Sequence, residues 1–204
     1  MSGFLLYGHP DSGHACKVAL ALRLAGQAHE TSRIDIWAPR ETRDAAFLAA
    51  SPAAEVPCLM IDGAPHVQSG AILLDLGERL TGLGGNNAAG MRRAREVLFW
   101  EANRIGMCLP QLIEARRTGA APFPPGAVAW LEGRFAVDRD RFDLLLGDAP
   151  FFHGDAPGIA DCAVWGYVQW VEKAGQTPSA AMAAWLTRMR DLPVETRPEA
   201  LFPA

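Results

Sequence analysis

A serine precedes the first strongly apolar helical pattern, and side chains of several chemical types lie near it. In the stretch LYGHPDSGHACKVALAL, Ser12 is the serine, and Tyr7, His14 and Cys16 are its neighbours. A hydroxyl at a helix N-terminus can stabilise a thiolate, because it donates a charge-assisted hydrogen bond beside the positive end of the helix dipole. Ser12 is therefore the first candidate for chemistry. Capping the helix is also a common role for serine, and the two roles are compatible.

The neighbours of Ser12 are alternatives of different kinds. Tyr7 could supply the hydroxyl instead, but it also ends an apolar run typical of a strand, so this alternative stays open. Cys16 lies one turn further along the helical pattern, where a cysteine is typical of a small buried hydrophobe rather than a nucleophile. We expect His14 to be an exposed loop residue without an acid–base role.

A second group of candidates lies between residues 53 and 76, in AAEVPCLMIDGAPHVQSGAILLDL. Pro57 lacks the N–H that a central strand needs, so we expect it at the first position of a strand. A cis Val56-Pro57 bond would expose the backbone groups of Val56 to a neighbour, although only ~5–6% of such bonds are cis. Gln68 and Ser69 come directly before an apolar helix, which Ser69 could cap while Gln68 is solvated.

The elements that must position these residues change in type near residue 81. Before it, the pattern is β-α-β-(α)-β-β-α, with strands in FLLYG and HETSRIDI, a helix in ACKVALALRLAG and a hairpin about Asp62-Gly63. After a Gly/Asn-rich connector at 81–90 the pattern is helical throughout. The helical segments are 91–117, 126–147, 158–175 and 179–192.

Composition excludes several classes of function. The chain has 19 basic and 23 acidic residues, a formal charge of -4 and no long basic run, so nucleic acid and anionic membrane are poor partners. Its four cysteines and five histidines show no metal-ligand spacing, and no apolar run approaches the ~20 residues of a membrane span. We expect a cytoplasmic protein with reduced thiols that binds no metal, nucleic acid or membrane.

The β-α-β half, the Val-Pro pair before the third strand, the polar pair opening a helix and the helical second half together resemble the cytosolic glutathione transferases. The resemblance covers essentially the full length. The segment GDAPGIADCAVWGY is also similar to the family's capping motif, with Asp161 in the acidic place and Gly158 where Ser or Thr is usual. The resemblance implies an α/β thioredoxin-like glutathione-binding domain over 1–80, a linker over 81–90 and an all-α helical bundle domain over 91–204.

The first loop is similar to that of the bacterial serine-type members of this family. The resemblance implies that Ser12 stabilises the thiolate of glutathione. It also implies that Ser69 holds the γ-glutamyl carboxylate and that Gln68 meets the neighbouring ammonium. The backbone of Val56, ahead of Pro57, would pair with the cysteinyl part. The expected protein is a detoxifying homodimer that uses glutathione as co-substrate and conjugates hydrophobic electrophiles.

The sequence leaves three points open. The glycine carboxylate of glutathione needs a cation, for which Arg40 and Arg43 are candidates. The helical domain should contribute the hydrophobic substrate site, with the following candidates: Phe99, Trp100, Met107 and Trp165. A non-catalytic glutathione-binding or protein-interaction module of the same fold is an alternative function. Thiol–disulfide or peroxide reduction would favour a cysteine in place of Ser12, so the serine counts against that reaction.

Overall fold

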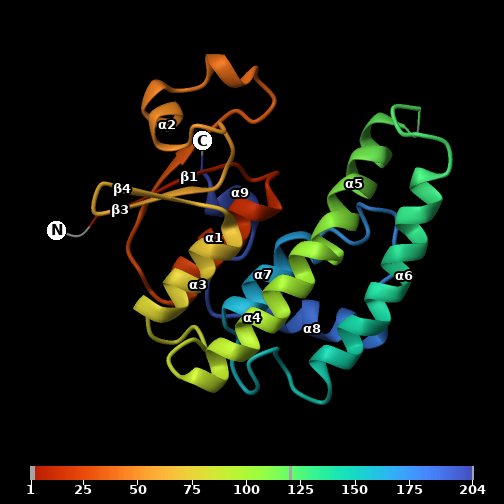
Figure 1. The fold of residues 1–204 in the computed structure, drawn as a ribbon. Helices are drawn as coiled ribbons and strands as arrows, with labels where there is room; N and C mark the ends of the chain where they lie inside the picture. Colours follow the sequence, from red (N-terminus) through yellow and green to blue (C-terminus); the bar gives the residue numbers. More distant parts are fainter. Residues whose placement is uncertain (1–2, 120, 204) are drawn as a thin grey trace.

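Four short strands form a mixed sheet in the first part of the chain (Figure 1). The computed structural model describes residues 3–119 and 121–203. The spatial order is β2-β1-β3-β4, with strands β1 (Phe4–Gly8), β2 (Glu30–Arg33), β3 (Cys58–Ile61) and β4 (Ala64–Val67). β1 runs parallel to β2 and antiparallel to β3, and β3 and β4 form the predicted hairpin.

Helices cover both faces of this sheet. They are α1 (Gly13–Leu24), the short 3-10 helix η1 (Arg40–Thr42), α2 (Ala45–Ala50) and α3 (Ser69–Arg79). Neighbouring side chains of β1 point to opposite faces, as strand geometry requires. Leu6 joins the larger core with α1 and α3, whereas Tyr7 packs against Phe47 of α2 on the other face.

The second part of the described chain is helical. Its helices are α4 (Ala88–Asn103), α5 (Ile105–Thr118), α6 (Ala127–Leu146), α7 (Ile159–Val168), α8 (Ala180–Arg190) and α9 (Pro198–Leu201). This confirms the predicted fold class, an α/β domain followed by an all-helical domain. None of the described helices is long and apolar enough to cross a membrane.

Three local predictions differ from the structure. The helical pattern over 91–117 is two helices, because Arg104 leaves the helical region with φ -125° and ψ -96°. The expected helix over 158–175 ends at Val168, after which the chain forms turns. Pro57 lies directly before β3 rather than at its first position. The expectation of a cis Val56-Pro57 bond, in contrast, is confirmed.

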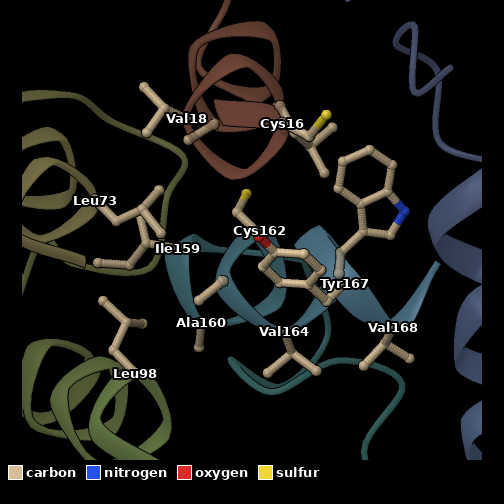
Figure 2. Close-up of a cluster of buried hydrophobic side chains, with 14 of the residues drawn as sticks. Cys16, Val18, Leu73, Leu98, Ile159, Ala160, Cys162, Val164, Tyr167 and Val168 are labelled. Carbon is tan, nitrogen blue, oxygen red and sulfur yellow. The ribbon is translucent and has the colours of Figure 1, made fainter. Parts of the chain in front are cut away.

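Helix α7 lies at the centre of the larger core and joins the two domains. Figure 2 shows Cys162 and Tyr167 of α7 on the side that faces α1, and Ile159 beside Leu73 of α3. The two helices approach closely because Gly13 of α1 has no side chain: a Cβ there would lie 2.5 Å from a backbone oxygen of α7. The close contact fixes the N-terminus of α1 against the helical domain.

Candidate active site

A cavity of about 760 Å³ lies between the two domains. We call it the interdomain cavity. Its lining comes from the first turns of α1, the segment 51–57, the β4–α3 junction with the first turns of α3, and α4. The volume is in the range of small-molecule sites, which are ≈ 300–1,000 Å³.

The N-terminus of α3 opens into the interdomain cavity. Gln68, Ser69, Gly70 and Ala71 all line it, and no side chain of the described residues caps this helix. Gln68 has φ 69°, a left-handed conformation that non-glycine residues rarely adopt. The first N–H groups of a helix lack intrahelical partners and carry the positive end of its dipole. This junction therefore has the properties of an anion site.

Val56 and Pro57 line the same cavity. No hydrogen bond from the backbone of Val56 to another residue of 3–119 or 121–203 is found. Its N–H and C=O are therefore available to an extended backbone placed in the cavity, as another strand would be. The structure thus brings four of the predicted site residues, Val56, Pro57, Gln68 and Ser69, to one cavity.

Ser12 does not line this cavity, although His14, two residues further along the chain, does. Ser12 is the N-cap residue of α1, its Oγ accepts from the N–H of Ala15 at 3.2 Å, and the residue is 8% exposed. A hydroxyl that accepts one hydrogen bond can still donate another. Tyr7 also lies outside the lining, in the core beneath α2, where burial raises the pKa of its hydroxyl.

His14 lines the cavity, and the expectation of an exposed loop residue is wrong. α1 begins at Gly13, before the expected start, so His14 belongs to its first turn. Its Nδ1 lies 3.3 Å from the Oγ of Ser69 and 3.3 Å from the Nζ of Lys17. Burial, and next the positive charge of Lys17, lower the pKa of His14 to about 3. The imidazole is therefore neutral near pH 7.

A buried ion pair joins the two domains beside His14. The Nζ of Lys17 on α1 lies 2.8 and 2.9 Å from the two carboxylate oxygens of Glu101 on α4. Burial raises the pKa of Glu101, and Lys17 opposes that effect. Sequence reasoning missed this pair because its members are 84 positions apart. The local signal was a lysine near the start of a mostly apolar helical run.

The two arginine candidates hold a loop instead of facing the cavity. Arg43 donates to backbone carbonyls, including those of Ile36 at 2.9 Å and Ala38 at 3.2 Å. Arg40 donates to the carbonyl of Ala53 at 3.3 Å. Neither arginine is part of the cavity lining.

All four apolar candidates lie in the described part of the chain, and of these four only Phe99 lines the interdomain cavity. Leu98 and Leu74 also line it. Phe99 is 71% exposed. Trp100 and Met107 pack against the core, and Trp165 is buried in it. The apolar wall of the cavity therefore comes from α3 and α4.

The described cysteines are unsuited to nucleophilic chemistry. All four are buried and free of disulfide bonds. Burial raises the pKa of every one of these thiols, that of Cys108 to about 11. A thiol with a raised pKa is inert at neutral pH, since the thiolate is the reactive form. Among residues 3–119 and 121–203, no group of three His, Cys, Asp or Glu side chains could hold a metal ion.

Comparisons with known proteins agree with this geometry. The chain matches the glutathione S-transferase N-terminal domain over residues 6–82 and the C-terminal domain over residues 125–204. It is 30% identical over 164 residues to a maleylacetoacetate isomerase of Rhizobium meliloti (strain 1021), a match that covers 77% of this chain and 76% of that protein. The chain belongs to the glutathione S-transferase family.

Two further relatives of this glutathione S-transferase family member cover nearly its whole length. The disulfide-bond oxidoreductase YfcG of Escherichia coli (strain K12) is 27% identical over 203 residues, 93% of this chain and 90% of that protein. A solved glutathione S-transferase from Xanthobacter autotrophicus Py2 is 27% identical with a TM-score of 0.81, covering 95% of each chain. The relatives' names differ in reaction, so family membership confirms the thioredoxin-like and helical domains but leaves the reaction to be argued from the site.

Proposed function

We propose that this chain is a transferase that joins the thiolate of glutathione to hydrophobic electrophiles. The observation that carries the proposal is the N-terminus of α3, which opens without a side-chain cap into a cavity with an apolar wall. The N–H groups of Ser69 and Gly70, with the Ser69 hydroxyl, would bind the γ-glutamyl carboxylate of glutathione. Gln68 is exposed and would accept from the ammonium through its amide oxygen, without a charge of its own.

The cysteinyl part of glutathione would pair with the backbone of Val56, beside Pro57. This placement directs the thiol toward the N-terminus of α1, where Ser12 lies. The hydroxyl of Ser12 would donate to the sulfur, and the positive end of the α1 dipole would add to that effect. Each unit by which the thiol pKa falls needs ~1.4 kcal/mol of preference for the thiolate.

The reaction needs no general base in the protein. The thiol proton leaves to water, and the sulfur lone pair then attacks an electrophilic carbon. A C–S bond forms while either a leaving group departs with its electron pair or the electrons move onto an activated double bond. The hydroxyl of Ser12 acts by holding the sulfur as thiolate before the attack.

The cavity favours a neutral, hydrophobic second substrate. Leu74, Leu98 and Phe99 form its apolar side. Lys17 is the one lysine or arginine among the described residues that line the cavity. Its ammonium group is paired with Glu101. An anionic second substrate, such as the maleylacetoacetate in one relative's name, would lack an unpaired cation here. The proposal also includes a homodimer in the cytoplasm that requires no metal.

The contact to the γ-glutamyl carboxylate is tested by Ser69→Ala. We expect glutathione binding to weaken by ~1–3 kcal/mol, because the variant leaves a buried carboxylate with one donor fewer. Isothermal titration calorimetry measures the change. Cysteinylglycine, which lacks the γ-glutamyl group, is the matched control: its weaker binding should be the same in both proteins. If the unmodified protein binds no glutathione, the proposed function is wrong.

A further inference from the structure

The buried pair Lys17–Glu101 has no part in the reaction described above. Both residues are only 2% exposed, and desolvating two charges generally costs as much as their attraction returns. Two glycines make room for the pair. A Cβ at Gly106 would lie 2.1 Å from a carboxylate oxygen of Glu101, and one at Gly166 would lie 2.5 Å from the Cγ of Lys17. The surrounding helices thus accommodate an ion pair that stability alone does not explain.

The pair determines which nitrogen of His14 carries the proton. A lysine ammonium has three donors and no acceptor. Lys17 places its Nζ at hydrogen-bond distance from both oxygens of Glu101 and from the Nδ1 of His14, at 3.3 Å. Nδ1 must then be the acceptor, so a neutral imidazole at this position carries its proton on Nε2.

The ring of His14 is fixed in orientation at the wall of the cavity. It packs edge-on against Tyr167, with centroids 5.0 Å apart and an interplanar angle of 82°. Within the part of the chain that the structure describes, Nε2 has no hydrogen-bond partner, and Nδ1 has two possible donors. His14 therefore offers one N–H donor from a side chain that lines the cavity beside Ser69.

We propose that His14 is a further catalytic residue, whose Nε2–H donates a hydrogen bond to the thiolate sulfur of glutathione, and that Lys17, held by Glu101, is its positioning residue. This inference rests on the proposed function. It adds a donor that lines the cavity to the hydroxyl of Ser12, which is not part of the lining. The imidazole does not take the thiol proton, because its Nδ1 faces donors and its Nε2 is already protonated.

Binding of the γ-glutamyl carboxylate leaves this arrangement intact. The hydroxyl of Ser69 has a single proton, which can go to Nδ1 of His14 or to a carboxylate. When a carboxylate accepts it, Lys17 still donates to Nδ1. The proton of His14 therefore stays on Nε2, and one side chain, Ser69, connects recognition of the ligand to the residue that meets its sulfur.

The test compares three variants in glutathione binding, turnover and the pKa of the bound thiol. His14→Phe keeps a ring but has no donor. His14→Asn keeps an acceptor for Lys17 and a donor for the sulfur. His66→Phe is the matched control, since His66 lies on β4 outside the cavity lining and contacts Asp75 at 3.5 Å.

We expect His14→Phe to raise the apparent thiol pKa by about one unit and to lower turnover near neutral pH about 10-fold, because a rise of one unit leaves about a tenth of the bound thiol as thiolate. Glutathione affinity should change less than about threefold, because a neutral thiol gains little from the donor. His14→Asn should restore turnover to within about fivefold. His66→Phe should match the unmodified protein. A His14→Phe variant with an unshifted thiol titration and full turnover overturns the inference but leaves the proposed function standing.

The tautomer of His14 can be measured in the unmodified protein, where no substitution affects folding. Nitrogen-15 NMR of the unmodified protein should show His14 protonated on Nε2 near pH 7. The double variant Lys17→Met with Glu101→Gln should lose that preference and raise the thiol pKa as His14→Phe does. An Nδ1–H tautomer in the unmodified protein would contradict the inference, because Lys17 could not then donate to that atom.

Discussion

Ser12 combines a structural and a proposed chemical role in one hydroxyl group. Its oxygen accepts from the N–H of Ala15, and its proton is available to a thiolate. The two roles can be separated by experiment because they affect different quantities. Loss of the cap lowers the free energy of unfolding, whereas loss of the donor changes the reactivity of a bound thiol.

We expect Ser12→Ala to lower turnover and raise the pKa of bound glutathione while leaving affinity nearly unchanged, since the hydroxyl bond strengthens as charge forms on sulfur. The variant should also lose about 1 kcal/mol of unfolding free energy. Steady-state kinetics, thiolate absorbance and urea unfolding measure these effects. Ser179→Ala, which removes the N-cap of α8, is the control: it should destabilise the protein without changing turnover.

The choice of Ser12 fails if its alanine variant keeps full turnover and an unshifted thiol titration. The thiolate would then rely on His14, on Tyr7 or on a backbone N–H. Tyr7 is the weakest of these, because it packs against Phe47 in the core and its pKa is raised by burial. Tyr7→Phe should change neither turnover nor the thiol pKa.

Among the helices, α7 shows how the chain compensates for an unusual residue at a helix N-terminus. Asp161 supplies one half of the expected capping box by accepting from the N–H of Gly158 at 3.0 Å. Gly158 cannot supply the other half. In its place, the Nε2 of His153 accepts from the N–H of Ala160 at 3.3 Å. A Cβ at Gly158 would lie 2.4 Å from the His153 ring, so this ring occupies the space of the missing side chain.

The hydrogen bond from the N–H of Ala160 to His153 makes the free energy of unfolding depend on pH. Burial, and next the charge of Arg93, lower the pKa of His153 to about 4, below its usual 6.5. The folded state therefore favours the neutral ring. The contribution of His153 to the free energy of unfolding is complete above pH 6.5 and is lost as the pH falls toward 4. His153→Gln keeps an acceptor at the place of Nε2 that does not titrate. We expect the unmodified protein to lose stability relative to His153→Gln across that window, measured by urea unfolding.

A double-mutant cycle tests the same compensation. His153→Ala should cost about 1 kcal/mol, the usual cost of a lost N-cap. Gly158→Ser should destabilise the unmodified protein, because its Cβ would lie 2.4 Å from the His153 ring and 2.5 Å from the carbonyl oxygen of Leu83, and it should destabilise His153→Ala less, because the contact with Leu83 alone remains. Equal effects of Gly158→Ser in both backgrounds would show that the two residues act independently.

The sequence predicted the elements better than the contacts between them. Periodicity located the strands, the hairpin at Asp62-Gly63 and most helices, because these patterns are local. It missed the break at Arg104, since the apolar pattern over 91–117 continues through it. The sequence also misjudged His14, because its surroundings depend on distant segments. Ser69 contacts its ring directly, and Glu101 holds Lys17, which contacts the same nitrogen. Four of the five predicted site residues line one cavity, whereas Ser12 is buried and is not part of the lining, which depends on packing that local patterns do not show.

At the scale of the whole molecule, the larger core continues across both domains. It contains residues of β1, α1 and α3 as well as residues of α4 to α9. The ion pair Lys17–Glu101 joins the same two domains next to the cavity. The site is therefore built from both domains, and its geometry depends on their contact.

A homodimer is the assembly expected from the family. The 71% exposed side chain of Phe99 on α4 and the exposed Val67 at the end of β4 give this side of the molecule apolar surface that a second copy could cover. We expect light scattering at micromolar concentration to give twice the mass of one chain. A mass of one chain at that concentration would contradict the expectation.

The proposed function depends on activation of the thiol of glutathione by this protein. The most direct measurement is the apparent pKa of glutathione bound to the unmodified protein, from thiolate absorbance against pH, beside a conjugation assay with a broad panel of electrophiles. We expect a pKa at least about one unit below the ~8.5 of a free thiol, and conjugation of one or more neutral hydrophobic electrophiles. Bound glutathione with an unshifted thiol pKa and no conjugation across the panel would contradict the claim and favour a glutathione-binding module without catalysis.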